Sequence, residues 1–143
     1  MTDFEASQVF NGTFGEMWLD GDYMSETESC KAEVGLNYES VTRVRNLMDG
    51  KKLVGMEGKG ETKLKKVSSY IIKKMSAMLK SGKTPSFTII MKIDDPDAIG
   101  AERVALYNCK FDKMILADWE RKKNSEESYS FTFEDWELLD VTK

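Results

Sequence analysis

Residues 29–36 read Ser-Cys-Lys-Ala-Glu-Val-Gly-Leu, a strict alternation of two kinds of position. Cys30, Ala32, Val34 and Leu36 are apolar, and the residues between them are polar, charged or glycine. Alternation with a period of two predicts a β-strand with one dry face and one wet face. We expect the dry face to pack against other parts of the chain and the wet face to meet solvent.

Similar patterns occur before and after this strand. Asp20-Gly21 is a turn-forming pair between Glu16–Leu19 and the run from Tyr23 onward, which predicts a β-hairpin. A further strand is expected from about Glu39 to Arg45. Near the end of the chain, Tyr129, Phe131 and Phe133 alternate with Ser130, Thr132 and Glu134, as in an aromatic strand.

The second half of the chain supplies the remaining strands. We predict strands over Phe87–Ile93, Arg103–Cys109 and Phe111–Trp119, with turns over Asp94–Gly100 and Arg121–Glu127. Short turns between neighbouring strands favour antiparallel pairing.

One helix is expected at residues 68–81. Ser68 or Ser69 can cap its start, and Gly82 can end it. Apolar residues recur at three- and four-residue steps, which predicts one face packed on a sheet. These residues are Val67, Ile71, Met75, Met78 and Leu79.

Residues 46–60 carry four glycines among lysines and little apolar periodicity, so we interpret them as a long flexible loop. The complete prediction is a mainly β (α+β) protein with about seven strands in two packed antiparallel sheets, forming a sandwich or partly open barrel with one flanking helix. One domain covers residues 1–143, with residues 1–10 as an N-terminal extension. Open sheet edges are a liability unless they are covered, charged or used to join chains.

Composition excludes several classes of function. The chain has 143 residues, a formal net charge of -4 and no histidine, so no Ser-His or Cys-His nucleophile can form. Cys30 and Cys109 are isolated and are read as small apolar residues. Asp94, Asp95 and Asp97 surround Pro96 and fit turn formers better than an acid–base pair. We therefore expect no enzyme activity, no cofactor and no metal site.

Charge is distributed unevenly along the chain. Residues 1–39 carry nine acidic residues and one lysine, whereas Lys51–Lys83 carries ten lysines and two glutamates. These segments can be solvated faces, or they can join identical copies head to tail by complementary charge. A third interpretation is a module that binds nucleic acid or an acidic partner through Lys51–Lys83, although Tyr70 is the only aromatic residue there.

The chain also resembles a known family, the tail-tube proteins of contractile phage tails, particularly those of PBSX-like defective prophages and R-type bacteriocins. The order and spacing of several motifs carry the resemblance along most of the chain, except for the first ten or so residues and Arg121–Ser128. The motifs are Asn11-Gly12, Gly15, Trp18-Leu19-Asp20-Gly21-Asp22, the glycines 50, 55, 58 and 60, Lys66-Val67-Ser68-Ser69, Gly82 with Pro85-Ser86-Phe87-Thr88, Gly100-Ala101-Glu102-Arg103-Val104-Ala105-Leu106-Tyr107, Phe111-Asp112, and Phe131-Thr132-Phe133-Glu134-Asp135-Trp136.

This resemblance implies a structural subunit that joins edge to edge into a hexameric ring, with rings stacking into a hollow tube. The implied partners are other copies of the chain, a sheath protein, a tape-measure protein and baseplate or hub proteins, with DNA passing through the lumen without specific binding. The loop at residues 46–60 is implied to reach the next ring through Gly50, Lys51, Lys52, Gly55 and Gly58. The wet strand face, Ser29, Lys31 and Glu33, can face the lumen.

The expected location rests on the start of the sequence, on its hydropathy and on the same resemblance. Met1–Gln8 is acidic and polar, where a secretory signal is basic and then apolar. No stretch approaches the roughly 20 apolar residues of a membrane span. We expect assembly in the bacterial cytoplasm, and a final place in a virion tail or a released bacteriocin particle.

Overall fold

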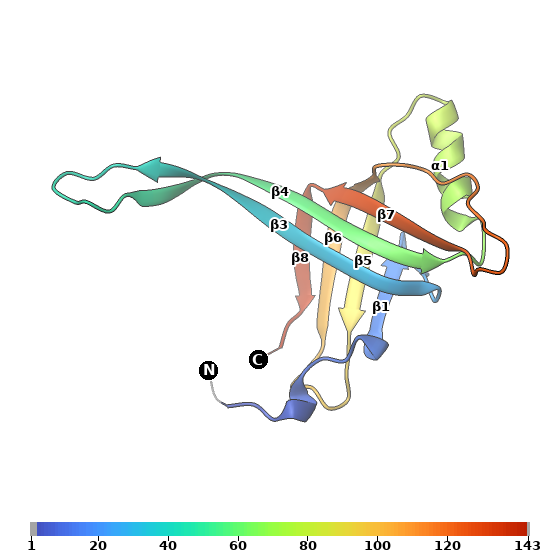
Figure 1. The fold of residues 1–143 in the computed structure, drawn as a ribbon, viewed down its shortest axis with the longest axis horizontal. Coiled ribbons are helices and arrows are strands. Elements are labelled where there is room, and N and C mark those ends of the chain that lie inside the picture. The colour runs from blue at the N-terminus through green and yellow to red at the C-terminus, as the bar shows by residue number, and fades with distance from the viewer. Residues whose placement is uncertain (1–2, 143) are drawn as a thin grey trace.

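The computed structural model describes residues 3–142, which form eight β-strands and one α-helix, α1 (Tyr70–Lys80), with two short 3-10 turns at Ala6–Gln8 and Gly12–Phe14. Figure 1 shows the strands as a body from which one long hairpin projects. The strands are β1 (Gly15–Leu19), β2 (Asp22–Tyr23), β3 (Thr27–Val41), β4 (Gly50–Lys65), β5 (Phe87–Ile93), β6 (Glu102–Phe111), β7 (Glu126–Phe133) and β8 (Asp135–Asp140).

All strands belong to one antiparallel sheet with the order β2-β1-β5-β6-β7-β4-β3, and β8 pairs with β6 outside this path. Strand β6 connects two parts of the sheet, because residues 102–109 pair with β5 or β8 whereas Lys110 and Phe111 pair with β7. We call β2, β1, β5, β6 and β8 the β1 half, and β7, β4 and β3 the β3 half. The β3 half crosses over the β1 half in Figure 1.

The prediction of two sheets is therefore confirmed only in its coarser form, a mainly β antiparallel fold with one helix. The two layers are halves of one hydrogen-bonded sheet that bends at β6. The sheet does not close into a barrel, since its terminal strands β2 and β3 are not paired with each other within residues 3–142.

The core lies between the two halves. The strict alternation in β7 is confirmed, because Tyr129, Phe131 and Phe133 are buried while the residues between them are exposed. The β1 half contributes Met17, Leu19, Ile89 and Leu106, each at most 1% exposed. The ring of Phe111 lies 5.3 Å from those of Phe87 and Tyr129, so β6 joins aromatic side chains from both halves.

Two local predictions are confirmed in position, although Ser69 at the start of the helix makes no capping hydrogen bond through its side chain. Asp20 and Gly21 have φ of 50° and 86°, the pair of left-handed residues that a tight hairpin turn requires. The helix occupies Tyr70–Lys80 and is followed by Gly82 at φ 78°. Its buried side is narrower than expected: Ile71 and Met75 are buried, whereas Met78 and Leu79 are exposed.

Three predictions about strands and loops are wrong. Gly50–Gly60 does not form a flexible loop but is part of β4, because β3 pairs with it over its entire length. The strand expected at Glu39–Arg45 is the end of β3, which stops at Val41. The strand expected at Phe111–Trp119 does not form, because β6 ends at Phe111 and residues 113–120 have no regular structure, although Met114 and Ile115 pack against the core.

Candidate assembly surfaces

The β3–β4 hairpin extends far beyond the body of the protein. The strands pair from Thr27↔Leu64 to Val41↔Gly50, but β7 accompanies β4 only from Gly58 to Lys65. Residues 35–57 therefore form a two-stranded projection, which we call the arm (Figure 1). An isolated two-stranded hairpin is marginally stable in water, so a projection of this length needs further contacts.

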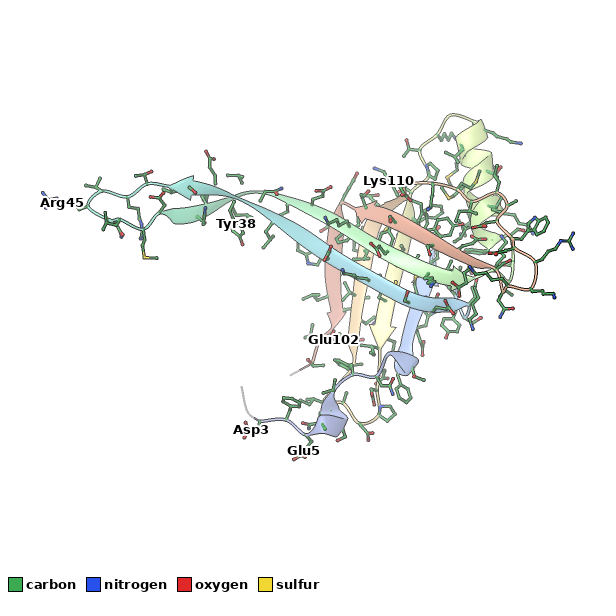
Figure 2. All side chains as sticks on the ribbon, in the orientation of Figure 1. Asp3, Glu5, Tyr38, Arg45, Glu102 and Lys110 are labelled. Carbon is green, nitrogen blue, oxygen red and sulfur yellow. The ribbon has the colours of Figure 1, made fainter. Side chains whose placement is uncertain are left out.

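One face of the arm is apolar and exposed. Leu36 lies opposite Met56 and Tyr38 lies opposite Leu53, with exposed fractions of 49%, 57%, 55% and 41%. In the body, the same face of β3 carries Cys30 and Val34, which pack against the core. Figure 2 labels Tyr38 on the arm, well outside the body. The arm thus continues the core-facing side of the sheet, and nothing from residues 3–142 covers it.

The tip of the arm is ordered by its own hydrogen bonds. Arg43 Nη2 donates to the Met48 carbonyl at 3.1 Å, and the Met48 amide donates to Asn46 Oδ1 at 3.0 Å. Where the two strands reach the tip, Lys51 Nζ donates to Ser40 Oγ at 2.7 Å. The large side chains at the tip are among the most exposed of the protein: Val44 at 93%, Leu47 at 105% and Met48 at 76%.

The residues predicted for the inter-ring contact lie along this arm and at its base. Gly50 begins β4, Lys51 and Lys52 follow it, and Gly55 lies opposite Asn37. Gly58 differs, because it lies opposite Phe133 inside the body. The structure therefore gathers four of the five residues on the projection and places the fifth at its root.

The face of the β3 half that points away from the core is polar, and we call it the polar face. Lys31 and Glu33 of β3 lie opposite Glu61 and Lys59 of β4, and Ser29 lies opposite Lys63. All three residues predicted for the lumen, Ser29, Lys31 and Glu33, are on this face and exposed. The polar face consists of Ser29, Lys31, Glu33, Glu57, Lys59, Glu61, Lys63, Ser130 and Thr132.

Charges on the polar face alternate in sign across the strands. Lys31 Nζ is 3.6 Å from Glu33 Oε2, and Lys63 Nζ is 3.2 Å from Glu126 Oε2 at the edge of the face. Lys63 lowers the pKa of the Glu126 carboxyl through this contact. Exposed ion pairs of this kind contribute little stability, so their main effect is to keep the face close to neutral.

The lysines of residues 51–83 do not form one basic surface. Lys51 and Lys52 are on the arm, and Lys59 and Lys63 are interleaved with glutamates on the polar face. Lys73, Lys74 and Lys80 are on α1, where Lys74 Nζ is 3.3 Å from Asp20 Oδ2. The sequence cluster is thus distributed over three parts of the molecule.

The candidate catalytic aspartates form a turn. Asp95 is buried and accepts hydrogen bonds from the amides of Asn11 and Asp97, each at 2.9 Å. Its carboxylate therefore holds residues 94–98 against the N-terminal segment. Within residues 3–142 there is no group of three potential metal-ligating side chains, and none of the helices described there is long and apolar enough to span a membrane.

The cysteines are unsuited to redox or nucleophilic chemistry. Burial raises the pKa of the Cys109 thiol to about 12 and that of Cys30 to about 11. Cys109 is fully buried as predicted, whereas Cys30 is partly buried and its Sγ lies 3.4 Å from Met17 Sδ. The thiolate is the reactive form, so both thiols are inert near neutral pH.

Three strands leave one edge unpaired within the described part of the chain. The short β2 pairs only with β1, β3 pairs only with β4, and β8 pairs only with β6. Sequence reasoning did not predict β8, although the alternation of Trp136 and Leu138 with Glu137 is a usable signal. These two side chains share the face of Leu106 and Val104 and are 40% and 61% exposed. The core-facing side of the β1 half is therefore uncovered at β8.

Comparison with known proteins places this geometry in a family. A family model described as "Phage tail tube protein" matches residues 2–140. The chain is 32% identical over 136 residues to the phage-like element PBSX protein XkdM of Bacillus subtilis (strain 168), covering 94% of this chain and 92% of the relative.

The fold resembles the folds of single chains in two assemblies solved by cryo-electron microscopy. The anti-feeding prophage cap matches with a TM-score of 0.74 at 5% identity, over 98% of this chain and 97% of that chain. A chain of the PVC extracellular contractile injection system, from its sheath-tube complex in the extended state, matches with a TM-score of 0.72 at 6% identity, over 97% of this chain and 100% of that chain. The match to the family model and the similarity to XkdM, both extending over nearly the complete sequence, show that this chain belongs to the phage tail tube protein family.

Proposed function

We propose that this protein assembles into six-membered rings that stack into the inner tube of a contractile injection machine, and that the tube is driven through a cell envelope when a surrounding sheath contracts. The subunit acts as a passive conduit wall, which needs self-association and stiffness but no catalytic group. It assembles in the bacterial cytoplasm and becomes part of a phage tail or a bacteriocin particle. Sheath, tape-measure and baseplate proteins are its partners besides its own copies.

The observation that carries this proposal is the uncovered apolar face of the arm. Four large side chains, on a hairpin held only by its own two strands, are 41% to 57% exposed. Exposed apolar patches of this kind mark interaction sites. A second copy is the occupant with suitable chemistry, because the arm continues the same face that packs against the core inside the body.

The open strand edges support association between neighbours in the ring. The free edge of β3 and the free edge of β8 can each accept a strand, and joining such edges around a ring removes them from solvent. The predicted inter-ring contact is assigned to the arm, with Gly50, Lys51, Lys52 and Gly55 along it and Gly58 at its base.

The polar face is proposed as the wall of the lumen. Its lysines and glutamates alternate in sign, so DNA passing along it meets no row of uncompensated cations. Phosphate contacts by lysine give salt-dependent affinity, which would retard transit. A Ser130→Cys variant tests this placement: in assembled tubes the new thiol should react with a small maleimide but not with one attached to a large polyethylene glycol.

The alternative function, a nucleic-acid or acidic-partner binding module using Lys51–Lys83, is disfavoured by the distribution of these lysines over the arm, the polar face and α1. The assembled protein should not retain duplex DNA in a gel-shift assay at physiological salt. Tight retention would favour the alternative.

Electron microscopy of the purified full chain tests the proposed function. Negative staining should show rings or tubes, with six subunits in the averaged ring. A protein that stays monomeric at high concentration, even with a baseplate nucleus added, would contradict the proposal.

A matched pair of variants tests the role of the arm. Tyr38→Ser with Leu53→Ser removes one cross-strand pair from the apolar face, and Asn37→Ser with Glu39→Ser removes two exposed polar side chains from the opposite face. We expect the first double variant to remain folded by circular dichroism but to lose assembly, whereas the second still assembles. Equal assembly of both would show that the apolar face is not the contact.

A further inference from the structure

Uncompensated charge of opposite sign gathers at the two ends of β1 and β5. Residues 94–102 contain four acidic and no basic residues, and residues 3–16 contain three acidic and no basic residues. By contrast, residues 66–83 contain five lysines and no acidic residue. We call the first two segments together the acidic pole and the third the basic pole.

The acidic pole is one physical unit. The Asn11 amide donates to Asp95 Oδ2 at 2.9 Å, which joins the N-terminal segment to the turn between β5 and β6. Figure 2 labels Asp3, Glu5 and Glu102 at the same end of the molecule. Asp94, Asp97 and Glu102 are exposed, and none of them forms an ion pair within residues 3–142.

Two basic residues near this pole lie next to acidic residues. Lys92 is opposite Glu16 in the β1–β5 pairing. Arg103 Nε lies 3.0 Å from Asp140 Oδ2, although not in hydrogen-bonding geometry. Asp3, Glu5, Asp94, Asp97 and Glu102 form no ion pair with any of the residues that the structure describes.

The basic pole is fixed to the opposite end of the same strands. The Tyr70 hydroxyl donates to the Leu19 carbonyl at 3.1 Å, so α1 is attached where β1 ends. Strand β5 starts four residues after Lys83 and stops directly before Asp94. Lys66 is paired with Glu127 at 2.7 Å and Lys74 with Asp20, so the uncompensated charge of the basic pole lies on Lys73, Lys80 and Lys83, which are exposed and form no ion pair within the described residues.

The two poles cannot neutralise each other inside one chain. Seven residues of strand separate them along β5, which corresponds to about 20 Å at the usual rise per residue. Exposed charges are screened beyond about 8 Å at physiological ionic strength. Each pole therefore needs a partner from outside, and each has the sign that the other requires.

We infer that the acidic pole of one copy contacts the basic pole of a copy in the next ring, so that charge complementarity fixes the stacking and gives the tube a direction. This inference rests on the proposed function and specifies one of its interfaces. A contact between different surfaces of identical subunits propagates without closing, as growth of a tube requires. The arm and strand edges join copies by apolar and backbone contacts, whereas the poles supply a salt-sensitive contact.

Charge reversal on the full-length protein tests the inference. Asp94→Lys with Asp97→Lys reverses two charges of the acidic pole, and Lys80→Glu with Lys83→Glu reverses two charges of the basic pole. Each variant alone should form rings but tubes shorter by about tenfold or more, because like charges across an interface cost several kcal/mol. An equimolar mixture should restore long tubes with alternating rings, and 1 M salt should shorten wild-type tubes.

The control variant reverses two acidic residues to lysine, as Asp94→Lys with Asp97→Lys does, but on a surface outside the two poles. Glu33→Lys with Glu61→Lys, on the part of the polar face that lies outside the arm, should leave tube length unchanged. Unchanged tubes from both pole variants, or rings that fail to stack in the mixture, would overturn the inference and leave the proposed function standing. Loss of rings by the pole variants would place the poles within the ring and also overturn it. Absence of rings and tubes from the wild type would instead refute the proposed function.

Discussion

The ring of Phe133 lies directly against the backbone of Gly58, so that a Cβ atom at residue 58 would come within 2.6 Å of two ring carbons. Gly60 has the same relationship to Phe131, at 2.5 Å from its Cζ. Both aromatic rings are buried in the core. Glycine is therefore needed at these two positions to make room for aromatic side chains. It is not needed there for a positive φ, which neither residue has.

Replacing Gly58 with alanine should destabilise the protein by about 1–3 kcal/mol, as overpacking of a core does. Gly35→Ala is the matched control, because its Cβ would lie 3.6 Å from the nearest atom, at ordinary contact distance. Urea unfolding of both variants in dilute solution measures the difference. Equal stability of the two would show that Phe133 can move aside without cost.

Asn108 has φ 54° at the irregular step of the β5–β6 pairing, where β6 carries an extra residue. Asparagine tolerates the left-handed region, whereas a β-branched residue does not. Asn108→Val should cost about 1–2 kcal/mol, and Asn108→Gly should be close to neutral. Thermal unfolding of the wild type and the two variants checks this order of stability. A valine variant as stable as the wild type would show that residue 108 does not need a left-handed conformation.

Both thiols should resist modification in the folded protein. Because burial raises the pKa of Cys30 to about 11 and that of Cys109 to about 12, both remain protonated at pH 8. A disulfide reagent should react slowly with native protein and rapidly in urea, with Cys30 the faster of the two since it is only partly buried. The single variants Cys30→Ser and Cys109→Ser assign the two rates. Rapid reaction of native protein would contradict the packing described.

Alkaline pH should weaken the fold through Tyr129. Burial and then a hydrogen bond to Glu127 raise the pKa of its hydroxyl. The unfolded chain releases this proton near pH ~10, while the folded protein retains it. The stabilisation is thus fully present below pH ~10 and is lost as pH rises above that, by up to about 1.4 kcal/mol per pH unit for one proton.

Tyr129→Phe should make this decline less steep, while the exposed Tyr23→Phe should leave it unchanged. Unfolding free energies between pH ~9.5 and ~11.5 provide the measurement. An identical decline in all three proteins would assign the alkaline sensitivity to other groups.

Sequence patterns correctly predicted the elements for which the local sequence pattern and the burial of side chains in the fold favour the same conformation. The alternation of Tyr129, Phe131 and Phe133 and the Asp20-Gly21 turn were predicted correctly because one physical requirement decides each of them. The family resemblance was likewise confirmed, since the order of motifs along the chain carries it.

Strand β4 was misread as a loop because glycine has two opposite uses. Gly58 and Gly60 signal flexibility when only neighbours in sequence are considered, but here they make room for Phe133 and Phe131, which are more than 70 positions later in the chain. The single bent sheet was also not predictable, because β6 pairs with β5, β8 and β7 along different parts of its length. Pairings of this kind depend on distant partners, not on local periodicity.

Strand β6 also determines how the subunit bears mechanical load. Because residues 102–109 are bonded to the β1 half and Lys110 and Phe111 to the β3 half, the two layers share one continuous covalent backbone. A push on either layer is passed to the other through peptide bonds as well as through side-chain packing. Sliding one layer over the other would require the backbone hydrogen bonds of β6 to break. The subunit therefore resists shear between its two layers, where a sandwich of separate sheets would be weakest.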